Sequence, residues 1–264
     1  MRTARVDAAE HRPLLAIRGL KKNFGALRAI DDLHLEVSSG GIFGIIGPNG
    51  SGKTTLFNVI SGVCAPAAGA VQFRGQDLTG LSSERVARHG IARTFQNLRI
   101  FRRLTVLENV LGAQTGSAGV SFLQAAFPHS GLERARRAEA MDILERVGLA
   151  DRREALAQEL PLGEQRRLEL ARAMARQPGL MMLDEPAGGM TPSETDDMAG
   201  LIERVAAGGP TVLLIEHKMG MVMSLCRRIA VLNFGRKIAE GAPAEIQRDG
   251  AAVEAYLGPG AVHA

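Results

Sequence analysis

Apolar residues along the chain follow two patterns that predict two kinds of β-strand. Residues 33–37, LHLEV, and 71–75, VQFRG, alternate apolar and polar side chains, as strands with one buried face do. By contrast, residues 42–46, 179–185 and 211–217 (IFGII, GLMMLDE and TVLLIEH) contain short continuous apolar runs. Such runs are typical of parallel strands that are buried on both faces. The pattern therefore predicts a mainly parallel sheet together with an antiparallel β layer.

A third pattern, with helical spacing, extends roughly over residues 104–176. Within it, residues 132–149 place Met141, Leu144 and Val147 on one stripe of a helix. A stripe of this kind packs against a core, because only one face of the helix is apolar. The region is expected to form a helical subdomain between the antiparallel layer and the later parallel strands.

The ends of the chain set the expected domain boundaries. Residues 231–241 predict a strand hairpin and residues 251–258 a short terminal helix, so the folded part reaches the C-terminal end. Residues 1–12 carry no apolar run and are expected to be a disordered tail. The sequence therefore predicts a single α/β domain over residues 13–264, with its helical subdomain at about 104–176.

Composition and charge narrow the possible partners. The chain has 264 residues, 45% of them hydrophobic, and a formal net charge of +4. It has no tryptophan and one tyrosine, so platforms for stacking nucleobases are scarce and no nucleic-acid partner is predicted. No apolar stretch is long enough to span a bilayer, and the N-terminus lacks the apolar region of a secretory signal. Cys64 and Cys226 show no metal-ligand spacing.

Residues 47–55, GPNGSGKTT, lie between an expected strand and an expected helix and match the pattern Gly-x4-Gly-Lys-Thr. In this context the pattern is a phosphate-binding P-loop, since glycines let backbone N–H groups approach phosphate oxygens at a helix N-terminus. Lys53 can reach the β and γ phosphates, and the Thr54 hydroxyl can bind Mg²⁺. The predicted nucleotide-binding residues of this loop are Gly47, Pro48, Asn49, Gly50, Ser51, Gly52, Lys53, Thr54 and Thr55.

Two neighbouring acids follow a buried apolar run at residues 179–183. In P-loop NTPases an aspartate in the position of Asp184 helps to hold Mg²⁺. Glu185, directly after it, is placed to act as general base on an attacking water. The pair favours hydrolysis of a nucleotide over transfer of its phosphate to another substrate.

With these motifs in place, the chain resembles the ATP-binding subunits of ABC transporters over nearly its whole length. The resemblance implies a P-loop core with a mainly parallel sheet, an antiparallel β subdomain and a helical subdomain. It also implies that Phe24 stacks on adenine, that Gln96 contacts Mg²⁺ or water, and that His217 contacts the γ-phosphate and the attacking water. ATP and Mg²⁺ are the implied cofactors.

Residues 160–174, LPLGEQRRLELARAM, stand where this family has its signature, Leu-Ser-Gly-Gly-Gln. Here Pro161 replaces the serine, Leu162 the first glycine and Glu164 the glutamine, while Gly163 remains. The family uses this segment to bind ATP held by a second subunit, so Gly163 is expected to act in trans. Proline supplies neither a hydroxyl nor an N–H, but it suits the first turn of a helix.

The altered signature resembles one branch of the family, the ATPases of branched-chain amino acid importers. In that branch two ATPases in a head-to-tail dimer, either paralogues or identical copies, act with integral membrane permease subunits and a solute-binding protein. The resemblance thus implies a cytoplasmic protein, peripheral on the inner face of the cell membrane. The dimer would open after hydrolysis and drive the permeases between two states.

Three alternatives remain. A lipid- or lipopolysaccharide-export ATPase would be expected to keep the signature serine that Pro161 replaces. A soluble ABC ATPase outside transport usually carries long coiled-coil insertions, zinc modules or two fused cassettes, none of which this sequence contains. A P-loop kinase or GTPase leaves Gln96, the signature region and His217 unexplained.

Overall fold

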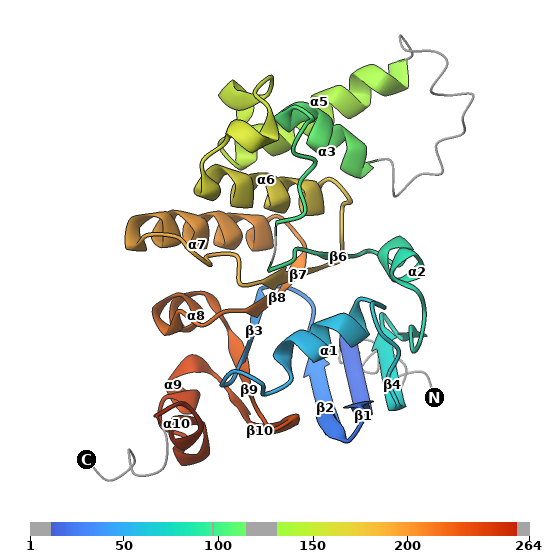
Figure 1. The fold of residues 1–264 in the computed structure, drawn as a ribbon, viewed down its shortest axis with the longest axis vertical. Helices are drawn as coiled ribbons and strands as arrows, with labels where there is room; N and C mark the ends of the chain where they lie inside the picture. The colour runs from blue at the N-terminus through green and yellow to red at the C-terminus, as the bar shows by residue number, and fades with distance from the viewer. Residues whose placement is uncertain (1–11, 97, 115–130, 258–264) are drawn as a thin grey trace, which may run out of the picture.

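A six-stranded sheet forms the centre of the computed structural model, which describes residues 12–96, 98–114 and 131–257 (Figure 1). Its strand order is β10-β9-β3-β8-β7-β6, and the pairs β9–β3, β3–β8, β8–β7 and β7–β6 are parallel. Strand β10 pairs with β9 in an antiparallel hairpin, as predicted. The strands are β3 (Ile42–Ile46), β6 (Ile91–Arg93), β7 (Leu180–Asp184), β8 (Thr211–Ile215), β9 (Arg228–Asn233) and β10 (Arg236–Gly241).

The second sheet is antiparallel, with the order β2-β1-β4-β5. Two of its strands contain the alternating segments that predicted them. Its strands are β1 (Leu15–Phe24), β2 (Leu27–Val37), β4 (Ala68–Phe73) and β5 (Gln76–Asp77). The sequence pattern did not identify β1, because register shifts between Ile17 and Asn23 interrupt its alternation. One of them lies at Gly19, whose φ is 56°.

Alternate residues of the central strands pack into two separate hydrophobic clusters. In β8, Val212 and Leu214 face the cluster that contains the helical region, whereas Leu213 and Ile215 face the antiparallel sheet and α1 (Lys53–Ile60). All five residues of β8 are buried. Burial on both faces explains why the continuous apolar runs predicted these strands correctly.

The helical region lies at one end of the molecule, above the central sheet in Figure 1. Its elements are α3 (Val106–Gln114), α5 (Gly131–Arg146), the short 3-10 turns η1 (Ala150–Arg152) and η2 (Ala157–Glu159), and α6 (Leu162–Met174). The predicted stripe of α5 is packed as expected: Leu144 and Val147 are buried and Met141 is partly buried against the same cluster. This region also supplies the helix that follows the altered signature.

The remaining helices flank the two sheets. They are α2 (Ser83–Arg88), α7 (Pro192–Ala207), α8 (Met219–Leu225), α9 (Pro243–Ile246) and α10 (Gly250–Leu257), the last of which the sequence predicted. Helix α7 lies between α6 and the sheet in Figure 1, and a Thr191–Glu194 capping box begins it. Within the described parts of the chain, no helix combines the length and apolarity needed to cross a membrane. The expected tail at residues 1–12 falls, except for Arg12, outside the described residues.

Candidate functional site

The glycine-rich loop connects the end of β3 to the start of α1, as the sequence predicted. Gly47, Gly50 and Gly52 all have positive φ, at 152°, 79° and 102°. A Cβ atom at Gly47 would lie 2.1 Å from the carbonyl oxygen of Leu232, and one at Gly52 would lie 2.5 Å from that of Ala29. Gly47 and Gly52 therefore require glycine, because backbone angle and space both exclude a side chain.

Lys53 begins α1 and folds its side chain back over the loop. Its Nζ donates to the carbonyl oxygens of Gly47 at 2.7 Å and Pro48 at 2.9 Å. Burial lowers the pKa of the ammonium group, while the carboxylates of Asp184 and Glu185 act in the opposite direction. No side chain caps the N-terminus of α1, so its first N–H groups can serve an anion. The loop is a cationic cradle rich in hydrogen-bond donors.

Asp184 ends β7 and is almost fully buried. One of its carboxylate oxygens accepts a hydrogen bond from Nη2 of Arg93 at 2.8 Å. Burial raises the pKa of this carboxyl group, and Arg93 acts to lower it. Through Nη1, Arg93 also donates to Asn58 at 2.7 Å and to Ser61 at 2.9 Å, in and directly after α1. A buried guanidinium thus ties the acidic strand end to the helix that follows the glycine-rich loop.

Glu185 lies between the other two side chains predicted to be catalytic. Its Oε1 is 2.9 Å from Nε2 of His217, and its Oε2 accepts from Nε2 of Gln96 at 3.1 Å. Glu185 has a φ of 50°, an uncommon left-handed conformation for a residue other than glycine. The three residues follow three neighbouring strands, β6, β7 and β8, so the sheet brings them together. The side chains of Glu185 and His217 are partly exposed, at 21% and 41%, and solvent can reach them.

Phe24 and Gly163 lie on other elements. Phe24 ends β1 with half of its surface exposed, and Nζ of Lys22 lies 5.1 Å from the centre of its ring. Gly163 lies in the first turn of α6, where a Cβ atom would be 3.2 Å from a carboxylate oxygen of Glu194. Pro161 is the N-cap of that helix and makes no side-chain cap, as expected from its lack of a hydroxyl. An exposed ring and a helix N-terminus remain accessible to a ligand.

Two buried charged residues at the site were not predicted from the sequence. The first is Arg93, described above. The second is Glu216, which is 2% exposed and accepts the backbone N–H groups of Ala187 at 2.8 Å and His217 at 2.9 Å. Through these two bonds Glu216 holds the turn that contains His217 against the segment that follows Glu185. A charged residue within or directly after an apolar strand is the signal that identifies both, because burial of a charge requires partners.

The donor atoms at this site fit a hard cation. Asp184 supplies a carboxylate, Thr54 a hydroxyl in the first turn of α1, and Gln96 an amide, and all three are oxygen donors. Over the described residues no cluster of three or more histidine, cysteine, aspartate or glutamate side chains forms a metal cage. Mg²⁺ bound to a nucleotide takes one or two protein ligands and completes its shell with phosphates and water.

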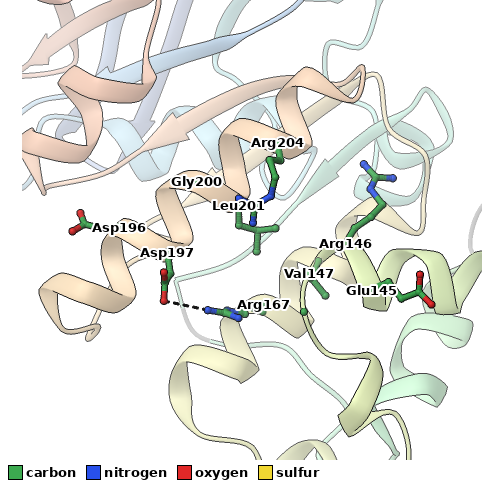
Figure 2. A pocket seen from close by; sticks show the side chains of 10 residues that line it. Glu145, Arg146, Val147, Arg167, Asp196, Asp197, Gly200, Leu201 and Arg204 are labelled. Atoms are coloured by element: carbon green, nitrogen blue, oxygen red, sulfur yellow. Dashed lines mark ion pairs between the residues drawn. The ribbon is translucent and has the colours of Figure 1, made fainter.

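A groove of about 740 Å³ lies elsewhere, between the end of α5, α6 and α7 (Figure 2). Its walls are charged, and Arg167 reaches Asp197 across it at 3.6 Å. None of the predicted site residues lines this groove.

Comparison with known proteins agrees with this geometry. A family model described as ABC transporter matches residues 30–188, and one described as branched-chain amino acid ATP-binding cassette transporter matches residues 236–258. The first match covers the glycine-rich loop, Gln96, the signature region and Glu185. The second covers β10, α9 and α10, which follow the strands that end before Glu185 and His217.

Individual relatives match over almost their full length. The high-affinity branched-chain amino acid transport ATP-binding protein BraF of Pseudomonas aeruginosa is 42% identical over 252 residues, 94% of this chain and 98% of BraF. The lipopolysaccharide export system ATP-binding protein LptB of Escherichia coli is 34% identical over 244 residues, 92% of this chain and 97% of LptB. The crystal structure of a nucleotide-free ATP-binding cassette from an ABC transporter superposes with a TM-score of 0.81 at 32% identity, covering 93% of this chain and 99% of that structure. The chain therefore belongs to the ATP-binding cassette family of ABC transporters.

Proposed function

We propose that this chain hydrolyses ATP to energise the import of branched-chain amino acids. The observation that carries the hydrolytic part is the contact of Glu185 with both Gln96 and His217 beside a P-loop. The similarity to BraF and the family match at residues 236–258 support the substrate class. We take residues 13–264 as one cassette, with a helical subdomain at about 104–176.

In the proposed site, the P-loop binds the triphosphate of ATP. Lys53 turns from its loop carbonyls toward the β and γ phosphates, and the N–H groups at the start of α1 bind oxygens of the same phosphates. Phe24 stacks on adenine. Thr54, Gln96 and Asp184 would hold Mg²⁺, which on binding neutralises charge on the β and γ phosphates.

Hydrolysis then depends on Glu185. Its carboxylate accepts a proton from the attacking water, which makes the water a stronger nucleophile. Nε2 of His217, 2.9 Å away, donates to the carboxylate and orients it, and with ATP bound the same N–H would turn toward the γ-phosphate. Gln96 contacts the other carboxylate oxygen and links this centre to the segment after β6. The left-handed backbone of Glu185 aims its side chain toward both partners.

The site is completed by a second ATPase subunit in a head-to-tail dimer. The chain has one P-loop and one signature region, so the nucleotide on one subunit is covered by Gly163 and the N-terminus of α6 of another. ATP stabilises the closed dimer, and hydrolysis lets it open. We propose integral membrane permeases as the elements that this motion drives, with the ATPase peripheral on the inner face of the membrane and a solute-binding protein outside.

Uptake in the host cell tests the proposal against its nearest alternative, lipopolysaccharide or lipid export, which the similarity to LptB favours. A chromosomal Glu185→Gln variant is expected to abolish high-affinity uptake of labelled leucine while glutamate uptake stays normal. Normal leucine uptake together with loss of lipopolysaccharide from the surface would establish the export function instead. Normal uptake and normal export together would contradict both.

A further inference from the structure

Two charged side chains of α6 form a nearly buried pair that faces the Gln96 segment, residues 94–96. Arg166 and Glu169 are one turn apart, with Nη1 and Oε2 separated by 3.6 Å, and their side chains are only 10% and 7% exposed. Burial raises the pKa of Glu169, and Arg166 acts to lower it. A buried charged pair requires further hydrogen bonds to be stable, and here the Gln96 segment provides them.

The pair binds the backbone of Phe95 and Gln96. Arg166 donates through Nη1 to the carbonyl oxygen of Phe95 at 3.3 Å and through Nη2 to that of Gln96 at 3.0 Å. Glu169 accepts the N–H of Phe95 at 3.1 Å. Two side chains of α6 thus bind three backbone groups, which are the N–H and C=O of Phe95 and the C=O of Gln96. The planar fork of arginine suits two neighbouring carbonyl groups, whereas a lysine ammonium is a single point charge.

The same guanidinium also lies beside the segment that follows Glu185. A Cβ atom at Gly188 would be 3.5 Å from Nη2 of Arg166. Arg166 therefore lies between the backbone of Gln96 and the turn after Glu185, the two residues whose side chains meet at 3.1 Å. Its helix begins at Leu162, directly after Pro161 of the altered signature. A displacement of α6 would therefore move the backbone of Gln96 through the hydrogen bonds of Arg166.

We infer that Arg166, with Glu169 as its buried counterion, is a positioning residue. It holds the backbone of Gln96 so that the Gln96 side chain contacts Glu185, and it couples this contact to the position of α6. This inference rests on the proposed hydrolytic function. It gives the QRRLE run of residues 165–169 a physical role: the signature helix, which faces the second subunit in the proposed dimer, is bonded directly to the catalytic centre of its own chain.

The test is a double-mutant cycle on the full-length chain that combines Arg166→Ala with Gln96→Ala and measures kcat and KM for ATP. Arg166→Ala is expected to lower kcat about tenfold or more, because a misplaced catalytic group loses rate steeply, and to leave KM within about twofold. In the Gln96→Ala background the same change should cost less than about twofold, since the group it positions is gone.

The matched control is Arg136→Ala. Arg136 also donates to a backbone carbonyl oxygen, that of Leu111 at 3.1 Å, but joins two helices of the helical region and does not touch the Gln96 segment. Its kcat should stay within about twofold of wild type. If Arg166→Ala fails to fold, Arg166→Lys replaces it and is expected to lower kcat at least about threefold, because it cannot reproduce the fork.

An unchanged kcat in Arg166→Ala, or in Arg166→Lys where the alanine variant does not fold, would overturn the inference. An equal loss with and without Gln96 would overturn it as well. Glu185→Gln in the same assay separates this result from a failure of the proposed function. Full turnover by Glu185→Gln would contradict the proposed role of Glu185 in hydrolysis. An inactive Glu185→Gln variant together with a fully active Arg166→Ala variant would overturn only the positioning role of Arg166.

Discussion

Oε1 of Glu185 lies 2.9 Å from Nε2 of His217, although the two residues are 32 positions apart in the chain. The contact exists because β7 and β8 are neighbouring parallel strands that end at the same edge of the sheet. Functional side chains collect at this edge in open α/β sheets. The pairing joins a carboxylate and an imidazole at a surface that solvent can enter, which supports the proposed roles of Glu185 as base and His217 as its orienting partner.

Replacement of Glu185 by glutamine is expected to separate ATP binding from hydrolysis. The amide keeps the shape of the side chain but cannot accept a proton from water, so kcat should fall at least about 10²-fold. Binding should persist, since Lys53 and the loop are untouched. Equilibrium binding of a fluorescent ATP analogue and steady-state phosphate release measure the two quantities. Near-normal turnover would exclude Glu185 as the base.

Replacement of Lys53 by alanine is expected to abolish nucleotide binding at micromolar concentrations. It removes the cation that the loop holds through the carbonyl groups of Gly47 and Pro48. Calorimetry measures the loss, and Lys21→Ala, at an exposed position on β1, is the control for removal of a positive charge. Retained binding in Lys53→Ala would contradict the assignment of the loop.

His217→Ala is expected to lower kcat by about 10²-fold, within the range for a group that assists proton transfer. The melting temperature should change little, because the side chain is 41% exposed and few packing contacts are lost. Phosphate release and thermal unfolding of the same preparation test both statements. A large drop in melting temperature would indicate a structural role for the imidazole.

The glycines of the P-loop should differ in their tolerance of alanine. Gly47→Ala is expected to lower the free energy of unfolding by about 3 kcal/mol or more, from backbone strain of roughly 1–3 kcal/mol and overpacking of similar size. Gly50→Ala should lower it by only about 1–2 kcal/mol, because nothing lies within 4 Å of its Cβ position and only strain remains. Urea unfolding measures both, and equal losses would contradict the geometry of the loop.

Glu169 gives a pH-dependent prediction. Burial raises its pKa in the folded state, so the folded protein gains stability as the pH falls through that pKa, whereas the ionised form is unfavourable above it. Glu169→Gln keeps an acceptor for Phe95 and removes the charge. Its melting temperature is therefore expected to exceed that of wild type at neutral pH. The difference should shrink toward acid pH.

The exposed Glu203→Gln is the control for removal of one carboxylate from a helix surface. A thermal melt of the three proteins across a pH series is the measurement. A Glu169→Gln variant that is less stable than wild type at neutral pH would mean that the attraction of Arg166 and Arg172 outweighs the desolvation of the carboxylate.

Elements with an unbroken pattern were predictable from the sequence. Strand β8 is buried along its whole length, so its run TVLLI predicted it, and the regular stripe of α5 predicted that helix. Strand β1 was missed because Gly19 and the register shifts around it break the period of two. Periodicity detects elements with uniform burial on a face and fails where the backbone is irregular.

The residues of the site were likewise predictable where they belong to a local motif and not where they meet through tertiary packing. The P-loop is local, so its spacing and its place between a strand and a helix predicted it. The two acids after a buried apolar run predicted Asp184 and Glu185, and family resemblance pointed to Gln96 and His217. The buried Arg93–Asp184 pair joins residues 91 positions apart, and Arg166 reaches the carbonyl oxygen of Gln96 across 70. Such contacts depend on how α6 and the strands pack, which no local pattern contains.

In the proposed mechanism ATP is held between two subunits, because this chain supplies one P-loop and one signature segment. The direct measurement is the ATPase rate per chain over a dilution series, alone and with a second ATPase subunit. The rate per chain is expected to fall on dilution and to be restored by the second subunit, since the active species forms by mass action. A rate that is constant on dilution, from a chain that sediments as a monomer and does not respond to a second subunit, would contradict the shared site.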